Sequence, residues 1–350
     1  MKTVYVGLSG GVDSAVSAAL LKQQGYTVVG AYIKIWSPEF LECTWEQDRL
    51  DALRVSVALG IPFKEIDLSN EYMKGVVDDM IENYKKGVTP NPDVLCNRLI
   101  KFGAFSKWAL EQGAEILATG HYAQVEKQGD SFVLKKGVDA SKDQSYFLYR
   151  LDQKDLSRAM FPIGNIPKAR VRELAQEFSL PVASKPDSQG LCFVGDVTMK
   201  DFLGRYIVLV KGEVIDQDKK VVGEHDGAAL YTSGQRHGFT LNSVSSARGP
   251  FYVIRTDVQK NIVFVSTNIE QCKHSSCIIS DMHWIGDAPG GPAKLSAVVR
   301  YHAAPVEITL KKDGSKIIAE FESPQLLTAG QSLVIYQDDI CLGGGTIQLQ

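Results

Sequence analysis

The chain lacks the long apolar runs that mark membrane proteins. None of its apolar stretches approaches the ~18 residues that a membrane-spanning helix needs. Its first residues lead directly into a strand-like run, with no basic segment followed by the apolar core of a secretion signal. The hydrophobic content of 44% and the charged content of 23% are typical of a globular protein. We therefore expect a soluble, cytoplasmic protein with no membrane partner.

Cysteine is scarce, and the Cys-x-x-Cys pair is absent. The 350 residues include six cysteines, which are Cys43, Cys96, Cys192, Cys272, Cys277 and Cys341. The missing pair argues against a zinc ribbon, an iron–sulfur cluster held by such a pair and a thioredoxin-type site. Any thiol chemistry must therefore join cysteines that lie far apart in the sequence.

An excess of basic residues is also missing. The formal net charge of −3 argues mildly against a general nucleic-acid binder, whose usual footprint is a basic surface. A protein that grips one folded RNA through a local patch is still compatible with this balance. Charge therefore leaves RNA binding open.

A glycine loop stands near the start of the chain, and it is neither of two common nucleotide-binding motifs. It is not Gly-x-x-x-x-Gly-Lys-Ser/Thr and not Gly-x-Gly-x-x-Gly. Residues 3–25 predict a β-strand, a tight loop with Gly10 and Gly11, and a helix that ends at Gly25. Asp13 stands where we expect the helix N-cap, and the first helical N–H groups point into the loop. This arrangement suits a phosphate or pyrophosphate.

The string Ser9-Gly10-Gly11-Val12-Asp13-Ser14 resembles the SGGxDS loop of the N-type ATP pyrophosphatases. The resemblance implies an enzyme that splits ATP between the α and β phosphates, holds pyrophosphate in the loop and passes AMP to an oxygen of an acceptor. The alternative is an ordinary strand-to-helix turn with convenient glycines. The motif alone indicates a nucleotide chemistry and leaves the acceptor open.

Strands and helices alternate after residue 25. We expect strands at 26–35, 62–66 and 114–119, and helices at 45–59, 70–86 and 97–112. This alternation predicts a parallel sheet with helices on both faces, and ligands bind beyond the carboxyl ends of such strands. The glycine loop, residues 32–35 and residues 120–122 should therefore surround one nucleotide. Ile33 is a candidate for the adenine wall, although a buried strand residue would look the same.

Residues 87–101 contain Pro90 and Pro92, so we expect a shaped loop between two helices. Cys96 stands at the mouth of the following helix, where Asn97 is a candidate cap. Helical N–H groups lower the pKa of a thiol in that position and make it more reactive. Asp93 is placed to move a proton for that thiol. The alternative is a small buried cysteine beside a turn-forming aspartate.

A second turn-rich loop, residues 183–195, surrounds Cys192, which follows Cys96 by 96 positions. If both loops converge on the nucleotide site, the two thiols can exchange sulfur. The sequence alone leaves their meeting unproven.

Charged residues mix with aromatic ones in residues 141–150. One interpretation is a surface where Lys142, Asp143 and Gln144 meet a polar partner. The other is an amphipathic segment that packs Phe147 and Leu148 inward.

Two further basic segments have equally plain interpretations. The helix expected at 166–178 carries Lys168, Arg170 and Arg172, which a solvated charged face explains just as well. Arg300 and Tyr301 end a predicted strand, and a lone pair of this kind is more often surface than ligand contact.

Helical periodicity fades from about Gly204, and short strand-like runs separated by turns replace it. They lie at 213–215, 251–255, 262–266, 295–301, 306–311, 316–321 and 332–336. The predicted fold class is α/β: a parallel-sheet nucleotide-binding domain followed by two small β-rich domains, the last barrel-like. We place the domains at 1–204, 205–275 and 276–350, with a helical extension in the first.

Taken together, the motifs resemble those of the tRNA-specific 2-thiouridylase family along the whole chain. In order they are GLSGGVDS, TPNPDVLCN followed by IKF, ATGHY, KDQSYFLY, KPDSQGLCF, GEHDG with YTSGQRHG, RYH and CLGGGTI. Family members place sulfur on C2 of the wobble uridine of certain tRNAs, using ATP and a persulfide delivered by a sulfur-relay partner. The resemblance therefore implies ATP with Mg²⁺ as cofactors, and tRNA and a sulfur-donor protein as partners.

The resemblance also implies roles for individual residues. Cys96 matches the nucleophile and Cys192 the persulfide carrier, which implies a Cys96–Cys192 disulfide during turnover, and Asp93 is the candidate general acid/base. The implied ATP contacts are Gly7, Leu8, Ser9, Gly10, Gly11, Val12, Asp13, Ser14, Ile33 and Gly120, with Asp13 as a candidate Mg²⁺ ligand. The implied contacts with the target base are Asn91, Pro92 and Asp93. The implied contacts with tRNA are His121, Lys142, Asp143, Gln144, Arg300, Tyr301 and Gln331.

The sequence departs from the family at two places outside the proposed catalytic loops. Residues 205–213 lack the usual Pro-Gly, and residues 238–241 read Gly-Phe-Thr-Leu where members commonly have Gly-Leu-Gly-Ile. Two rival functions also stay open. One is another ATP-splitting synthetase or amidotransferase that acts on a small molecule, and the other is a catalytically silent, nucleotide-gated RNA-binding protein.

Overall fold

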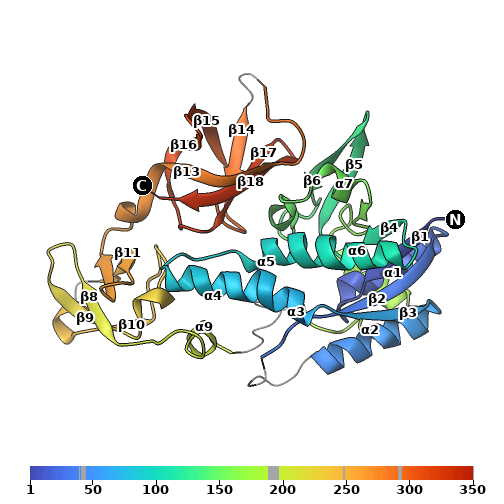
Figure 1. Cartoon of the computed structure of the whole chain (residues 1–350), viewed down its shortest axis with the longest axis horizontal. Helices are drawn as coiled ribbons and strands as arrows, with labels where there is room; N and C mark the ends of the chain where they lie inside the picture. The colour runs from blue at the N-terminus through green and yellow to red at the C-terminus, as the bar shows by residue number, and fades with distance from the viewer. Residues whose placement is uncertain (39, 41–44, 188–196, 247–248, 291–293, 350) are drawn as a thin grey trace.

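The computed structural model contains three sheets, which form three regions of the molecule (Figure 1). It describes residues 1–350 except 39, 41–44, 188–196, 247–248, 291–293 and 350. The first sheet lies near the N-terminus, a second small sheet lies at the opposite end of the molecule, and the third lies beside both (Figure 1).

The first sheet is parallel and has five strands. Their spatial order is β3 (Phe63–Asp67), β2 (Thr27–Lys34), β1 (Thr3–Gly7), β4 (Ile116–Ala118) and β7 (Ala159–Met160). Alternate residues of β1 enter different cores, because successive side chains of a strand point to opposite faces. Val4 and Val6 pack in one core and Tyr5 in the other. Both faces of the sheet are therefore covered by apolar packing, as the sequence predicts.

Helices from three parts of the chain cover one face. These are α1 (Val12–Gln23), α2 (Trp45–Leu59) and α8 (Lys168–Glu177), whose buried residues share a core with Val4 and Val6. The other face is covered by two longer helical segments. One consists of α3 (Ser69–Tyr72), the π-helical turn η1 (Met73–Val77) and α4 (Asp78–Lys85), and the other of α5 (Pro92–Leu95), η2 (Cys96–Ala104) and α6 (Phe105–Glu111).

The start of the second long segment differs from the prediction. We expected a helix from residue 97, but the helix begins at Pro92, with Asn91 as its N-cap residue. Proline at the first helical position costs nothing, because the N–H that it lacks would have no helical partner there. Cys96 is therefore the fifth residue of a continuous helical segment and does not stand at its mouth.

A hairpin and two short helices leave this sheet and contact the third one. The hairpin consists of β5 (Ala123–Gln128) and β6 (Ser131–Lys136), and the helices are η3 (Ser145–Leu148) and α7 (Gln153–Leu156). Strand β6 pairs with β18 of the third sheet, so the chain's first region supplies two strands to its last.

The second sheet forms a small central module. After α9 (Met199–Leu203), its strands are β8 (Gly212–Ile215), β9 (Val221–His225), β10 (Phe239–Leu241), β11 (Tyr252–Asp257) and β12 (Ile262–Ser266), in the spatial order β10-β9-β8-β12-β11. Three short helices accompany them, η4 (Ala228–Leu230), α10 (Ser243–Ser246) and η5 (Ile269–Cys272). Val214, Val253 and Val263 lie in its core, fully buried.

The third sheet closes into a six-stranded barrel. Its strands are β13 (Lys273–Trp284), β14 (Leu295–Val298), β15 (Val306–Asp313), β16 (Lys316–Leu326), β17 (Ser332–Gln337) and β18 (Ile340–Gln348). The pairing of β13 with β18 closes the ring, which removes the exposed edges of an open sheet. The predicted fold class is thus confirmed. Among the described helices, none combines the length and the apolar character that crossing a membrane requires.

Candidate active site

The glycine loop connects β1 to α1 at the carboxyl edge of the parallel sheet. Gly10 has a φ of +74°, a left-handed conformation that glycine adopts without strain, and a Cβ there would lie 2.4 Å from the carbonyl oxygen of Asp48. The Ser14 hydroxyl accepts from the Ser9 N–H at 3.2 Å and donates to the Gly11 carbonyl, also at 3.2 Å. The loop therefore curls over the first turn of α1, where N–H groups favour an anion.

Strand β4 ends against this loop because residue 120 is glycine. A Cβ on Gly120 would lie 2.7 Å from the amide nitrogen of Ser14 and 2.8 Å from the carbonyl carbon of Asp13. Ile33 is half-buried near the carboxyl end of β2 and packs against the core on the sheet's other face. The residues predicted to hold ATP thus share one edge of the sheet.

Asp13 has a different role from the expected one. The N-cap residue of α1 is Gly11, and Asp13 lies inside the first turn. Its carboxylate accepts from the Tyr122 hydroxyl at 2.8 Å and from Lys168 Nζ at 2.7 and 2.9 Å. Because these partners hold the carboxylate outside the helix, it cannot also reach back to cap the helix.

Lys168 joins the glycine loop to Asp187, a residue of the second cysteine loop. Its Nζ lies 2.9 Å from Asp187 Oδ1, and Asp187 also pairs with Lys142 at 3.1 Å and with Arg172. Burial raises the pKa of Asp187, but the hydrogen bonds from Lys168 and Lys142 outweigh it and lower that pKa to about 2. Two residues of the charged face expected on α8, Lys168 and Arg172, therefore belong to an ion-pair network at the site.

Lys168 and Asp187 were not predicted from the sequence as site residues. Asp187 belongs to the string KPDSQGLCF, so its place in the second cysteine loop was a usable signal. Lys168 offered no such signal, because the sequence places it on the same helix as Arg170, another basic residue, which pairs with the exposed Glu173 and Glu177. Nothing in the spacing separates these two basic residues.

A cavity of about 320 Å³ lies beside the start of α5. Six residues predicted to contact the base or tRNA line it, from three distant parts of the chain: Asn91, Pro92, Asp93, Arg300, Tyr301 and Gln331. Apolar and aromatic side chains complete the wall, namely Met80, Tyr84 and Phe147, with Thr89 and Pro90. The rings of Phe147 and Tyr301 are 4.4 Å apart between centroids. Such a wall suits a planar ring that needs both stacking and hydrogen bonds.

Asp93 is the acidic group of this cavity. It is half-buried in the first turn of α5. Burial raises the pKa of Asp93 above its usual value, and the positive charge of Lys101 partly opposes that effect. A carboxyl group whose pKa is raised in this way is suited to carry and transfer a proton.

Cys96 follows Asp93 by one turn of the same helical segment, so both side chains lie on neighbouring parts of one helix face. Its side chain is buried, with 7% exposed, and packs in the core behind the cavity. The next residue, Asn97, donates to the Phe147 carbonyl at 3.3 Å and so ties this helix to η3. Cys192 and Cys43 lie outside the described residues. Cys272, Cys277 and Cys341 are buried thiols of the two β-rich regions.

His121 is buried beside η2, the helical segment that begins at Cys96, and the centroid of its ring lies 6.4 Å from that of Phe102. Its Nδ1 lies 2.7 Å from Thr119 Oγ1 and its Nε2 lies 3.4 Å from Lys101 Nζ. Because an ammonium group can only donate, Nε2 is the acceptor and Nδ1 carries the proton. Burial, with a smaller contribution from Lys101, lowers the pKa of His121 well below its usual value. The imidazole is therefore neutral.

The three polar residues predicted at 142–144 all make contacts within the protein. Lys142 pairs with Asp187, as described above. Asp143 accepts from the Gly137 N–H at 2.9 Å and from the Ser145 hydroxyl at 3.0 Å. Gln144 accepts from the Tyr122 N–H at 3.0 Å. Arg300 and Tyr301, in contrast, face the cavity.

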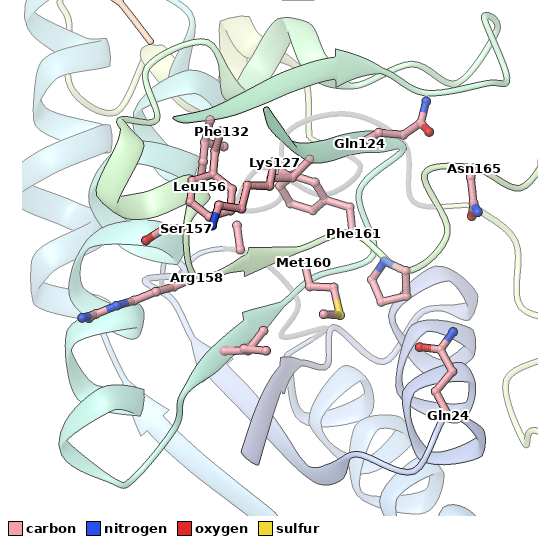
Figure 2. A pocket seen from close by; sticks show the side chains of 14 residues that line it. Gln24, Gln124, Lys127, Phe132, Leu156, Ser157, Arg158, Met160, Phe161 and Asn165 are labelled. Carbon is pink, nitrogen blue, oxygen red and sulfur yellow. The ribbon is translucent and has the colours of Figure 1, made fainter. Parts of the chain in front are cut away.

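A larger groove, of about 450 Å³, lies elsewhere (Figure 2). Gln24 after α1 and Ile116 at the start of β4 line it, which places it at the amino edge of the sheet, opposite the glycine loop. In Figure 2 the Arg158 side chain extends away from the groove's centre, whereas Phe161 and Met160 lie within it. None of the predicted site residues lines this groove, so we place the site at the smaller cavity.

The described residues contain no group of three histidine, cysteine, aspartate or glutamate side chains that could hold a metal ion. Asp13 is the carboxylate in the glycine loop, and Lys168 contacts both of its oxygens. Mg²⁺ commonly binds nucleotide phosphates with only one or two protein carboxylates. The residues present are therefore compatible only with a Mg²⁺ ion held mainly by the phosphates.

Comparison with known families covers nearly the whole chain. Residues 2–196 match the family described as tRNA methyl transferase HUP domain. Residues 200–267 match the tRNA methyl transferase PRC-barrel domain, and residues 274–347 match the aminomethyltransferase beta-barrel domain.

Individual relatives are similar over their full length. A protein of Cupriavidus necator named tRNA-specific 2-thiouridylase MnmA is 44% identical over 356 residues, covering 99% of this chain and 99% of that protein. A protein of the same name from Methylobacillus flagellatus is 41% identical over 354 residues, covering 99% and 98%. Among solved structures, the U34-tRNA thiolase NcsA from Methanococcus maripaludis is 18% identical with a TM-score of 0.37, covering 59% of this chain and 64% of that one.

Proposed function

The chain belongs to the tRNA-specific 2-thiouridylase family, and from that membership and the geometry of the site we propose that it is an ATP-dependent tRNA 2-thiouridylase. Its substrate in this proposal is the wobble uridine of tRNA, and its product carries sulfur at C2. Its sulfur arrives as a persulfide from a sulfur-relay partner protein. We also propose that it works in the cytoplasm and that its domains span 1–204, 205–275 and 276–350.

The observation that carries the proposal is the cavity beside α5. It joins a carboxyl group of raised pKa (Asp93), an exposed arginine (Arg300) and two aromatic rings whose planes are tilted by 49°, in a space suited to one base. The base must leave the anticodon stack to enter it, as bases do in enzymes that modify them. Asn91, Pro92 and Asp93 would contact the base, and Arg300 and Tyr301 the RNA around it.

The glycine loop supports the use of ATP. The C2 oxygen of uracil is a poor leaving group. When this oxygen is bonded to the α-phosphorus, the group that leaves C2 is AMP, which is a good leaving group. In the proposed first step the C2 oxygen attacks the α-phosphorus of ATP, the bond between the α- and β-phosphates breaks, and pyrophosphate stays in the loop formed by residues 7–14. The product of this step is the base adenylated at its C2 oxygen.

The sulfur step uses two thiols. Cys192 carries the outer sulfur as a persulfide, and the Cys96 thiolate attacks the inner sulfur. The sulfur–sulfur bond of the persulfide breaks, a Cys96–Cys192 disulfide forms, and the released hydrosulfide attacks C2 and expels AMP. In the alternative route the outer persulfide sulfur attacks C2 directly and expels AMP, and the Cys96 thiolate then attacks the Cys192 sulfur, which breaks the sulfur–sulfur bond, releases the thiolated base and forms the same disulfide. In both routes Asp93 moves the proton, and thiols of the sulfur-relay partner reduce the disulfide before the next turnover.

The roles of the two cysteines can be tested by mass spectrometry of wobble nucleosides from cells that lack this gene. We expect 2-thiouridine to return with the wild-type copy and to stay absent with Cys96→Ser or Cys192→Ser. Cys272→Ser is the matched control, because its thiol is buried in another region and donates to the Val253 carbonyl at 3.3 Å. Full thiolation by either catalytic variant would refute the sulfur mechanism.

Two rival functions give different results with the purified protein. A synthetase that activates a small molecule would keep most of its rate of pyrophosphate release in both cysteine variants and would not require tRNA. A silent RNA-binding protein would bind tRNA but release neither AMP nor pyrophosphate. The proposed enzyme requires tRNA for both products.

A further inference from the structure

The loop that leads into α5 is held by both β-rich regions. The Thr89 N–H donates to the Ala329 carbonyl of the barrel at 3.1 Å. Gln331 Nε2 donates to two successive carbonyls of the loop, those of Thr89 at 3.0 Å and Pro90 at 2.8 Å. Both N–H groups of the Gln331 amide therefore donate to the loop, although Gln331 was predicted to contact tRNA.

The central module adds a contact from the other direction. The hydroxyl groups of Thr89 and Thr232 lie 2.8 Å apart. Thr232 begins the string Thr232-Ser233-Gly234-Gln235, a turn in which the Gln235 N–H donates to the Thr232 carbonyl at 3.1 Å. The Gln235 side chain accepts from the Thr232 N–H at 3.2 Å, so the turn fixes the residue that meets Thr89.

Glycines allow the loop before α5, the central module and the barrel to approach one another closely. A Cβ on Gly87 would lie 2.7 Å from Val258 of the central module, and a Cβ on Gly330 would lie 2.2 Å from Val88. A Cβ on Gly234 would lie 2.7 Å from Leu326 of the barrel. The loop is therefore packed between the two modules as well as hydrogen-bonded to them.

We propose that Thr232 and Gln331 are positioning residues for residues 89–93, which are the loop before α5 and the first two residues of that helix. The inference rests on the proposed function, and it gives the central module and its YTSGQRHG string a part in catalysis. Neither residue touches the reacting atoms in this role. Each acts through backbone or hydroxyl contacts of Thr89 and Pro90, which set where Asn91 and Asp93 stand in the cavity.

The expected effects follow from how sharply reaction rates depend on position. A displacement of about 1 Å at a catalytic group can lower a rate 10²-fold. Loss of one hydrogen bond weakens a contact by about 1 kcal/mol, which is roughly a fivefold change in the population of the correct position. We therefore expect rate losses between these two limits and little change in the affinity for either substrate.

The first experiment is a double-mutant cycle on the hydroxyl pair. Thr232→Val and Thr89→Val keep the shape of the side chain and remove the hydroxyl. We expect each to lower the single-turnover rate of thiolation about 5- to 10-fold, with the KM for ATP and the Kd for tRNA changed less than twofold. The double variant should lose no more than either single variant, because they break the same contact. Additive losses would overturn the inference.

Thr240→Val is the matched control, because Thr240 is exposed on β10 of the same module. It should keep the wild-type rate. If Thr232→Val loses no more than this control, Thr232 is only a packing residue and the inference is wrong for it.

The second experiment replaces Gln331 with Met, which has similar length and no N–H donors, and uses the exposed Gln337→Met on β17 as its control. We expect the single-turnover rate to fall about 5- to 10-fold while tRNA binding stays within twofold of wild type. A raised Kd for tRNA with an unchanged rate would instead make Gln331 a direct RNA contact and overturn its positioning role.

Failure of this inference is distinct from failure of the proposed function. If the wild-type protein thiolates tRNA and all variants match their controls, only the positioning role falls. If the wild-type protein supplied with ATP, tRNA and a persulfide donor makes no 2-thiouridine, the proposed function falls and the positioning role falls with it.

Discussion

Lys101 is the charge that faces two titrating groups of the site at once. Its positive charge lowers the pKa of Asp93 and also that of His121, in both cases as the smaller influence after burial. For Asp93 the two influences oppose each other, so Lys101 holds down a pKa that burial raises. The charge of Lys101 therefore partly offsets the effect of burial on the pH at which Asp93 exchanges its proton.

We predict that Lys101→Met raises the pKa of Asp93 further. A carboxyl group of higher pKa keeps its proton to a higher pH, so the limb of the pH–rate profile that Asp93 governs should move upward. Single-turnover thiolation across a pH series measures it. Lys101→Arg, which keeps the charge, should leave the limb near its wild-type position, and Asp93→Asn should remove the limb. A limb that stays in place in Lys101→Met would contradict the assignment.

Lys168 is the cation shared by the glycine loop and Asp187. Its side chain is 13% exposed and contacts two carboxylates at 2.9 Å or less. Lys168→Ala leaves those carboxylates without their common partner and makes the loop less favourable for a triphosphate. We predict a rise in the KM for ATP of roughly 10-fold, from a loss of about 1.4 kcal/mol, measured by tRNA-dependent AMP release. Arg170→Ala on the same helix should change this KM less than twofold.

At the scale of elements, the sequence predicted the strands and helices of the fold better than the arrangement of the site residues. Strand β12 has the predicted bounds, 262–266, because β-branched and aromatic residues lie between clear turn residues. The helix start at Pro92 was missed because proline forbids a helix interior but favours its first turn. The hairpin β5–β6 was missed because its outer residues, such as Glu126 and Lys127, are polar and exposed.

The sequence did not predict which distant site residues lie next to one another in the folded protein. Spacing places Asn91 and Gln331 on no common element, and the contacts of Gln331 with the carbonyls of residues 89 and 90 are among those that bring them together. Six of the residues that the family motifs named line one cavity. They did not reveal which of them face that cavity and which, like Asp143 and Gln144, bond inside the protein.

The junction of β4 with the glycine loop gives a prediction at this scale. Gly120→Ala puts a methyl group within 2.8 Å of the backbone of Asp13 and Ser14, so the strand or the loop must shift. Overpacking of this kind costs about 1–3 kcal/mol. We expect tRNA-dependent AMP release to fall at least about 10-fold, because the first turn of α1 moves from the phosphates.

The control for this variant is Gly286→Ala, since a Cβ on Gly286 has Gln153 Nε2 at 3.8 Å as its nearest neighbour. It should keep wild-type AMP release and a wild-type melting temperature. A Gly120→Ala enzyme that releases AMP at the normal rate would show that β4 does not brace the loop.

At the scale of the whole molecule, the barrel is docked on the nucleotide-binding region by buried polar contacts. The Tyr146 hydroxyl donates to the Ser332 carbonyl at 3.0 Å, and the hydroxyls of Ser145 and Tyr336 lie 3.0 Å apart. Gln153 Nε2 donates to the Ile285 carbonyl at 2.9 Å. Buried hydrogen bonds of this kind fix orientation, because any sliding leaves polar groups unpaired.

We predict that Tyr146→Phe lowers the free energy of unfolding by about 1 kcal/mol. Because the lost bond joins two regions, the barrel and the nucleotide-binding region should melt together at a lower temperature in differential scanning calorimetry. Tyr252→Phe on the central module is the control and should melt as the wild type does. A Tyr146→Phe trace in which only one region shifts would show that the two unfold independently.

The pairing of β6 with β18 has a consequence for anyone who recombines this protein with its relatives. The sheet of the C-terminal barrel is extended by the hairpin β5–β6, residues 123–136, which lies more than a hundred residues earlier in the chain. A chimaera that exchanges only the C-terminal segment would combine the barrel of one relative with the hairpin β5–β6 of another. The side chains along the β6–β18 pairing would then not match. The natural cassette for exchange therefore has two pieces, and a crossover that carries both should yield folded hybrids far more often than one that carries the tail alone.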